Sequence, residues 1–186
     1  MVFGGVDPGL VSPAAAVVSG GRVLSAATLT IGRTLRGARR LVEIRHQLEA
    51  FFAPWGPLEG LAIEGPSLGS VHREYDLGEA SGAIKSWVCE RHDLEPQVVE
   101  PARLKLYATG NGQADKAAVM EYVVRRLGYP VDGDDAADAI VLAHISFALA
   151  VKERPATRDQ AEVLRALRHP EPPGRRAARR TRSNNI

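Results

Sequence analysis

The sequence predicts an α/β fold with a mixed sheet of about five strands, the first three antiparallel, flanked by helices. Short apolar runs separated by glycine and proline fill the first 30 residues, and helical segments then alternate with strand-length apolar runs. These two patterns are typical of an α/β domain. With 186 residues, 45% hydrophobic and 25% charged, the chain also has the composition of a soluble globular protein with a sizeable core.

The first three strands are predicted at residues 2–6, Ala14–Ser19 and Arg22–Thr28. The first is short and apolar, and it runs into the turn Asp7-Pro8-Gly9. The second and third flank Gly20-Gly21, and two apolar runs joined by a glycine pair are a strong hairpin signal. We therefore expect three consecutive antiparallel strands.

The remaining elements alternate between helices and strands. A helix from Thr34 to about Phe52 has apolar residues on one side and ends before Pro54 and Pro57. After it we expect the strand Gly60–Glu64, a helix from His72 to about Arg91, the strand Gln97–Glu100, a short helix from Pro101, the loop Gly110-Asn111-Gly112, and helices at Ala114–Leu127, Asp134 to about Lys152 and Arg158–Leu167. Ligand sites in such sheets gather at the carboxyl ends of strands, where Asp7 and Glu64 are expected.

The charge distribution predicts a folded unit over residues 1–169 and a basic, disordered tail over 170–186. The last 13 residues, from Gly174, contain five arginines and no acid, and without these arginines the net charge of +2 would be −3. Such a tail is typical either of a nucleic-acid arm that acts by counterion release or of a solubilising segment. The composition favours neither interpretation.

We expect the protein to act in a reducing cytoplasm. No apolar run approaches the length of a spanning helix, and the start of the chain lacks the basic and long apolar regions of a signal peptide. The single cysteine, Cys89, excludes an internal disulfide framework and a cysteine-based zinc site. We expect Cys89 to be a small core residue on its helix.

Four carboxylates lie in positions that suit a metal-dependent nuclease. Asp7 and Glu64 end apolar strands, while Asp135 and Asp138 lie three residues apart on one face of a predicted helix. Burying such acids is costly unless a cation offsets their charge, and carboxylates suit Mg²⁺ or Mn²⁺. Two such ions, about 3.5–4 Å apart, would straddle a phosphodiester. The structural alternative is that Asp7 starts a turn and that Asp134 or Asp135 caps a helix.

The lysines are informative because there are only four. Lys105 follows a predicted strand, and Lys116 follows the glycine loop 110–112. A lysine beside exposed backbone N–H groups favours a phosphate, although a solvated residue at a helix start is an equally good interpretation. The loop spacing matches neither a Walker A motif nor a dinucleotide fingerprint.

Several other residues are expected to be structural. His144, two turns beyond Asp138, is predicted to be a core histidine and not a metal ligand. Tyr107 is expected to pack in the protein, although a tyrosine near Lys105 would also suit base stacking. His46, His72 and Arg73 are placed on solvated helix faces.

Four stretches of the chain resemble the RuvC family of Holliday-junction resolvases, within the ribonuclease H-like superfamily. They are GGVDPGL, LAIEGPSLG, EPARLKLYATGNGQADKAAVM and DDAADAIVLAHI, and the resemblance covers most of residues 2–150. It implies a ribonuclease H-like sheet and a crossover junction endodeoxyribonuclease, a divalent-metal-dependent phosphodiester hydrolase. Such an enzyme nicks two strands of a four-way junction in pairs and leaves 5′-phosphate and 3′-hydroxyl ends.

The resemblance also implies the roles of particular residues. Two Mg²⁺ ions per active site, with Mn²⁺ as the alternative, would be held by Asp7, Glu64, Asp135 and Asp138, and Lys116 would join them as a catalytic residue. The resemblance implies as well that Lys105 and Lys116 contact DNA phosphates near the cut. Further DNA-contacting residues are expected from the sequence itself: Gly110, Asn111, Gly112, Leu68 and Arg73, and, in the basic tail, Arg175, Arg176, Arg179 and Arg180. A homodimer is implied, joined by the helix His72–Arg91, whose residues Gly78, Ala80, Gly82 and Ala83 suit close approach of another element.

Two features depart from the family pattern. Members often carry an aromatic wedge shortly after the strand-ending glutamate, whereas this chain has Gly65-Pro66-Ser67-Leu68-Gly69, with Leu68 as a smaller wedge. The family core also does not need the arginine-rich tail. These departures favour a phage-encoded relative, acting in the bacterial or phage-infected bacterial cytoplasm.

Three alternative functions follow. A phage-type nuclease would cut flaps and forks with relaxed specificity. A ribonuclease H-like enzyme would process RNA or RNA–DNA hybrids, and the loop lysines and the dimer helix argue for DNA junctions instead. A non-catalytic DNA-binding protein would use the basic tail, but it gains nothing from acids placed beside phosphates. The sequence identifies no partner helicase.

Overall fold

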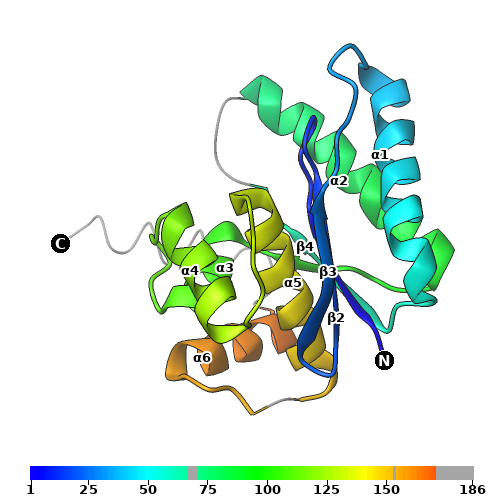
Figure 1. Ribbon diagram of the computed structural model, residues 1–186. Helices are drawn as coiled ribbons and strands as arrows, with labels where there is room; N and C mark the ends of the chain where they lie inside the picture. Colours follow the sequence, from blue (N-terminus) through cyan, green and yellow to red (C-terminus); the bar gives the residue numbers. More distant parts are fainter. Residues whose placement is uncertain (67–70, 153, 171–186) are drawn as a thin grey trace.

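A five-stranded mixed sheet carries helices on both faces (Figure 1). The computed structural model describes residues 1–66, 71–152 and 154–170, with the backbone alone at 71–74. The strands are β1 (Phe3–Asp7), β2 (Ala14–Ser19), β3 (Arg22–Thr28), β4 (Gly60–Glu64) and β5 (Gln97–Val99). The helices are α1 (Gly37–Phe52), the 3₁₀ turn η1 (Ala53–Trp55), α2 (Val71–His92), α3 (Pro101–Thr109), α4 (Lys116–Arg126), α5 (Asp134–Ala150) and α6 (Arg158–Arg168).

The strand order is β3-β2-β1-β4-β5. The strands β1, β2 and β3 pair antiparallel, which confirms the prediction, whereas β4 and β5 extend the sheet in parallel with β1. The hairpin between β2 and β3 turns at Gly20 and Gly21, with φ values of 56° and 76°. Two successive positive φ angles are what a tight hairpin turn requires, so the glycine pair sets the register here.

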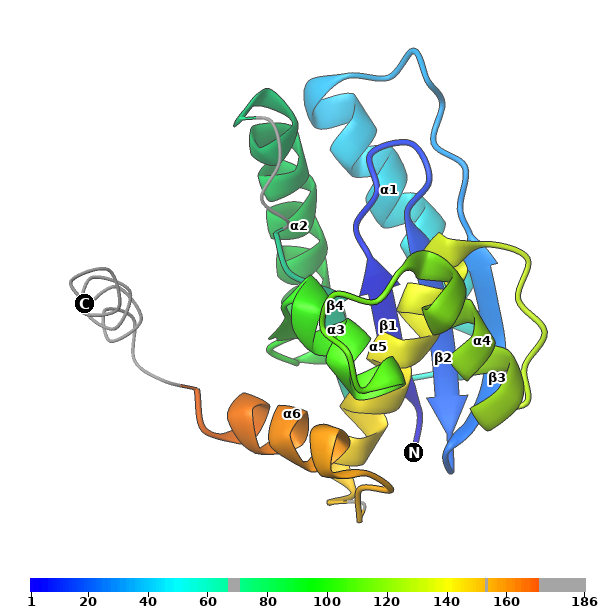
Figure 2. The same ribbon diagram turned by 90° about the vertical axis from the view of Figure 1, so that its left-hand side faces the viewer.

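Both faces of the sheet are covered. On β2, Ala14, Ala16 and Val18 pack beneath α3–α6, while Ala15 and Val17 pack beneath α1 and α2. The two views show the same division into layers (Figure 2). Alternate side chains of a strand point to opposite faces of the sheet. A strand that is buried on both faces therefore has a continuously apolar sequence.

Helix α5 lies directly on the centre of the sheet because Gly5 has no side chain. A Cβ atom at Gly5 would lie 2.1 Å from the carbonyl oxygen of Ala139 and 2.3 Å from the nitrogen of Ala143. Any larger residue would displace the helix backbone. This contact fixes α5 against β1 and thereby places the first turn of the helix beside the end of the strand.

The structure corrects the predicted start of α1 and the predicted burial of Cys89. Helix α1 begins at Gly37 and not at Thr34, because Arg36, the N-cap residue, has an extended backbone. Cys89 is exposed, not buried as expected. The core face of α2 follows Ala80, Ile84 and Val88, all fully buried, and Cys89 lies about 100° around the helix from Val88.

Some small residues of α2 lie in the core and others lie on an open face of the helix. Ala80 is fully buried in the core, whereas a Cβ atom at Gly78 or Gly82 would meet nothing within 4 Å. The two glycines therefore leave an open face on α2 within the described chain. No helix in the described ranges is long and apolar enough to cross a membrane.

Candidate active site

Asp7 and Glu64 lie side by side at the carboxyl ends of two adjacent parallel strands. The register pairs Val6 of β1 with Ile63 of β4, so the two acids are the next residues on neighbouring strands. Their carboxyl groups lie within hydrogen-bonding reach, and this interaction lowers the pKa of Asp7 and raises the pKa of Glu64. Both acids therefore lie at the carboxyl ends of strands, as expected, and these strands are neighbours in the sheet.

The first turn of α5 brings further acids to the same strand ends. Gly133 is the N-cap, so Asp134 and Asp135 lie within the first turn and neither side chain caps the helix. The capping alternative for these two residues is therefore wrong. Asp135 accepts a hydrogen bond of 3.2 Å from Ser12 Oγ, in the loop that follows β1. Acids in this turn are favoured by the helix dipole.

The electrostatics show that the four acids form one cluster. Burial, followed by the charges of Asp7 and Asp138, raises the pKa of Glu64 to about 9. Burial and the charge of Asp7 also raise the pKa of Asp138 to about 7. Burial raises the pKa of Asp7 to about 6, opposed by the hydrogen bond from Glu64, and the charge of Asp135 raises it further. Asp7 thus interacts with the other three acids and lies at the centre of the cluster.

Two lysines lie close enough to act on this cluster. The charge of Lys116 lowers the pKa values of Asp7 and Asp138, and that of Lys105 lowers the pKa values of Glu64 and Asp138. Lys116 also forms an ion pair with Asp134. Lysines and acids that the sequence analysis singled out separately are therefore neighbours in the fold.

Lys116 is held in place by the start of α4. Asp115 is the N-cap, and its side chain accepts a hydrogen bond of 2.9 Å from the nitrogen of Ala118. The helix therefore begins at Lys116 and not at Ala114 as expected, because the cap residue itself is extended. The ammonium group projects from the first turn and is exposed to solvent.

The loop Gly110–Gly112 uses much of its hydrogen-bonding capacity internally. Gly110, with a φ of 76°, ends α3, and its N–H donates to the oxygen of Leu106. The nitrogen of Asn111 donates to Thr109 Oγ1 at 3.1 Å, and the Asn111 side chain accepts from Gln113 at 2.9 Å. Phosphate contact at this loop would therefore rest on the adjacent lysine more than on these N–H groups.

The donor chemistry of the cluster fits a hard divalent cation. Carboxylate oxygens are the ligands that Mg²⁺ and Mn²⁺ prefer, and a cation would offset the negative charge that burial and mutual repulsion make costly. In the positions described, however, no three His, Cys, Asp or Glu side chains close on one point tightly enough to hold an ion. The raised pKa of Glu64, which burial and the charge of Asp7 cause, favours a proton on this carboxyl group when no cation is bound.

The other residues of the sequence analysis lie elsewhere. His144 is paired with Tyr107, with 3.0 Å from Nδ1 to the hydroxyl, and both pack among rings and core side chains, as expected. His46 is exposed on α1. Leu68, Arg175, Arg176, Arg179 and Arg180 lie outside the described residues, as do the side chains of His72 and Arg73.

Sequence reasoning missed two residues of the site. Ser12 contacts Asp135 across 123 positions of sequence, and no local pattern marks such a partner. The sequence analysis considered Asp134 only as a helix cap, whereas the structure pairs it with Lys116. Its ion pair with Lys116 depends on the packing of α4 against α5.

The sequence matches a family model over most of its length. Residues 3–146 match the model described as crossover junction endodeoxyribonuclease RuvC. A relative of that name from Cutibacterium acnes is 36% identical over 147 residues, which cover 75% of this chain and 74% of the relative. Another, from Streptomyces avermitilis, is 35% identical over 148 residues, covering 75% and 82%.

Solved structures share the fold. RuvC from Thermus thermophilus matches with a TM-score of 0.64 and 23% identity, over 77% of this chain and 92% of that chain. The same protein in complex with a Holliday junction substrate matches with a TM-score of 0.67, over 77% and 91%. The arrangement of sheet and helices is therefore that of the RuvC structures, which confirms the predicted ribonuclease H-like fold.

Proposed function

The chain belongs to the RuvC family, and we propose that it is a divalent-metal-dependent DNA endonuclease that cuts four-way junctions. The observation that carries the proposal is the convergence of Asp7, Glu64, Asp135 and Asp138, from three distant segments, beside two lysines. Its expected place of action is the bacterial cytoplasm, where such DNA occurs.

We propose that the four acids hold Mg²⁺, two ions per site, with Mn²⁺ as a substitute. When bound, the ions would supply an activated water and stabilise the charge that develops on the leaving oxygen. The protein's part is to fix the acids on rigid elements. Asp7 and Glu64 are held by the sheet register and Asp135 by Ser12, so little rearrangement of the backbone is needed for the side chains to exchange a proton for a cation.

Lys105 and Lys116 are the proposed phosphate contacts. Both project positive charge towards the acid cluster, as the effects on the acid pKa values indicate. Lys116 would exchange its carboxylate partner Asp134 for a phosphate of the DNA and so hold the scissile strand. The surrounding charge gives affinity without base recognition, which suits an enzyme that selects DNA by shape.

A homodimer is the proposed working form, because two nicks in opposed strands need two active sites. The open face of α2 at Gly78 and Gly82 suits close approach of a second copy. Sedimentation velocity on the full chain tests this: a dimer is expected both alone and on a junction. A monomer under both conditions would contradict the proposal that a homodimer nicks two strands in pairs.

A cleavage panel tests the proposed activity. Four-way junction, flap, fork, duplex and RNA–DNA hybrid are compared in Mg²⁺, in Mn²⁺ and with chelator. We expect metal-dependent nicking that is fastest on the four-way junction. Equal cutting of flaps and forks would favour the alternative of a branched-DNA nuclease with relaxed specificity. The sequence supports this alternative because it has no Phe, Trp or Tyr between Glu64 and Tyr75. Cutting of the hybrid alone would contradict a DNA junction enzyme.

A further inference from the structure

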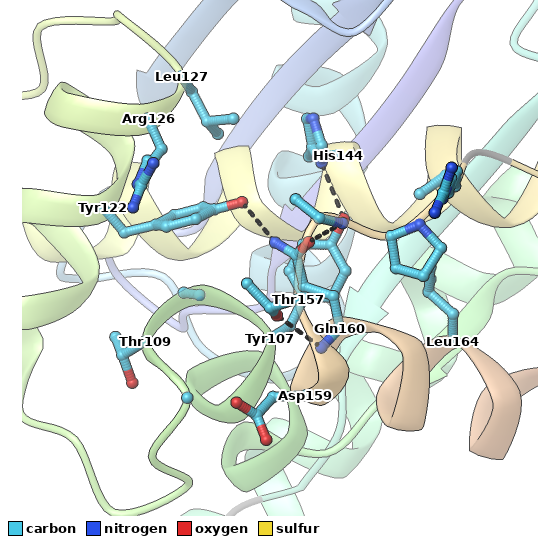
Figure 3. A pocket seen from close by; sticks show the side chains of 16 residues that line it. Tyr107, Thr109, Tyr122, Arg126, Leu127, His144, Thr157, Asp159, Gln160 and Leu164 are labelled. Carbon is cyan, nitrogen blue, oxygen red and sulfur yellow. Dashed lines mark hydrogen bonds between the residues drawn. The ribbon is translucent and has the colours of Figure 1, made fainter.

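A cavity of about 550 Å³ lies between α3, α4, α5 and α6, apart from the acid cluster. Figure 3 shows side chains from all four helices pointing into it. Its volume is within the range of roughly 300–1,000 Å³ that is typical of small-molecule sites. None of the four clustered acids lines it.

Helix α6 forms one wall of this cavity and lies beyond the segment that matches the family model. The helix is firmly attached, because Val163 and Leu164 are buried in the core. Gln160, 7% exposed, donates to the Tyr122 hydroxyl at 3.2 Å and accepts from the nitrogen of Ala156 at 3.0 Å (Figure 3). The cavity is therefore preformed, and its α6 wall is an addition to the matched segment.

The cavity is lined by two exposed arginines and by one carboxylate, that of Asp159. Arg126 of α4 and Arg154, which precedes α6, both line it. Neither forms an ion pair with any residue in the described ranges. By contrast, the neighbouring Arg125 is paired with Glu121 at 3.0 Å and does not line the cavity. Guanidinium groups at a cavity favour a phosphate or carboxylate, which they bind through paired hydrogen bonds.

The rest of the lining suits an aromatic and hydroxylated group. Tyr122 lies half-buried beside Arg126, and the hydrogen-bonded pair of Tyr107 and His144 forms the inner wall (Figure 3). Asp159 lies near the α3 end, where its carboxylate oxygen would be 3.1 Å from a Cβ atom at Gly110. That carboxylate repels an anion but accepts hydrogen bonds from a hydroxyl or an amine.

We propose that this cavity binds a nucleoside phosphate, either as a free nucleotide or as one nucleotide of a DNA strand. Arg126 and Arg154 hold the phosphate, the ring of Tyr122 offers a stacking surface, and Asp159 accepts from the sugar hydroxyl or the base amine. The site is separate from the acid cluster, so the proposal does not depend on the proposed cleavage activity.

Isothermal titration calorimetry of the full chain tests the proposal with dAMP, deoxyadenosine and inorganic phosphate. We expect dAMP to bind. Deoxyadenosine and inorganic phosphate should each bind with an affinity at least about tenfold lower, because each retains only part of the contacts. Arg126→Gln and Arg154→Gln should each weaken dAMP binding about tenfold, as loss of a charge-assisted contact implies. The matched control Arg125→Gln should leave it unchanged.

Two further measurements test whether dAMP binds in the cavity or at the lysines of the acid cluster, and whether the natural ligand is a free nucleotide or part of a DNA strand. Lys116→Gln should leave dAMP binding unchanged if the cavity is the site. Displacement of dAMP by a short single-stranded oligonucleotide indicates a strand, and its failure indicates a free nucleotide; either result supports the proposal. Absence of dAMP binding, equal losses in Arg125→Gln and Arg126→Gln, or loss in Lys116→Gln alone would overturn it.

Discussion

Glu64 and Asp7 lie at the adjacent ends of β4 and β1, with their carboxyl groups within hydrogen-bonding reach of each other. Burial and mutual repulsion make two negative charges on this pair costly, so the pair favours retention of one proton. A cation offers the same relief without the proton. The site therefore favours either a bound proton or a bound metal cation. Stability and metal-binding measurements can detect both without an activity assay.

The metal-free protein should lose stability as the pH rises. The raised pKa values of Asp7, Asp138 and Glu64, about 6, 7 and 9, mean that the folded chain keeps protons that the unfolded chain has already released. The contribution of these three acids to the free energy of unfolding should therefore be most favourable below about pH 4 to 5. It should decrease as the pH rises from there to about 9. Urea unfolding with chelator across this range measures it.

Glu64→Gln should flatten that pH dependence. The amide keeps a donor towards Asp7 but cannot ionise, so at about pH 8 the metal-free variant should exceed the wild type by about 1–3 kcal/mol in unfolding free energy. The exposed Glu59→Gln is the matched control and should follow the wild type. A variant that is less stable than the wild type at high pH would contradict the proton-sharing account.

Mg²⁺ binding should release protons. A cation that replaces the proton shared by Glu64 and Asp7 sends that proton to the buffer. At neutral pH, calorimetric heats should therefore depend on the ionisation enthalpy of the buffer, and this dependence should diminish in Glu64→Gln. Heats that are identical in buffers of different ionisation enthalpy would show that the metal binds without displacing the proton.

Gly5→Ala should destabilise the protein severely. The new Cβ would lie 2.1 Å from a backbone oxygen of α5, and backbone cannot turn aside as a side chain can. We expect a loss of about 3 kcal/mol or more in unfolding free energy, measured by urea unfolding. Gly4→Ala is the matched control: its Cβ would meet only side-chain atoms at 3.1–3.2 Å, so it should cost less. Equal losses would show that the contact with α5 is not the constraint.

Lys116→Gln should weaken DNA binding and reduce its salt dependence. Loss of one phosphate contact lowers the slope of log affinity against log salt by about 1, whatever the DNA sequence. Fluorescence anisotropy on a four-way junction with chelator measures both quantities. Lys152→Gln, an exposed position at the far end of α5, should match the wild type. If the two variants behave alike, Lys116 is not a phosphate contact.

Much of the fold and of the acid cluster was predictable from local pattern. Apolar runs that end in Asp7 and Glu64 indicate strand ends, and a spacing of three places Asp135 and Asp138 on one helical face. The exposure of Cys89 was not predicted, because a small residue next to a buried one gives no sign of which side it faces. The Ser12–Asp135 contact and the cavity at α6 arise from packing between distant segments, which periodicity does not encode.

The most direct test of the account is single-turnover cleavage of a synthetic four-way junction by Asp7→Asn in Mg²⁺. Asp7 interacts with the other three acids, so its neutralisation should remove the central ligand. We expect the cleavage rate to fall at least about 100-fold, which corresponds to roughly 3 kcal/mol, while junction affinity with chelator stays within about threefold of the wild type. Nicking by the variant at the wild-type rate would contradict the assignment of the active site.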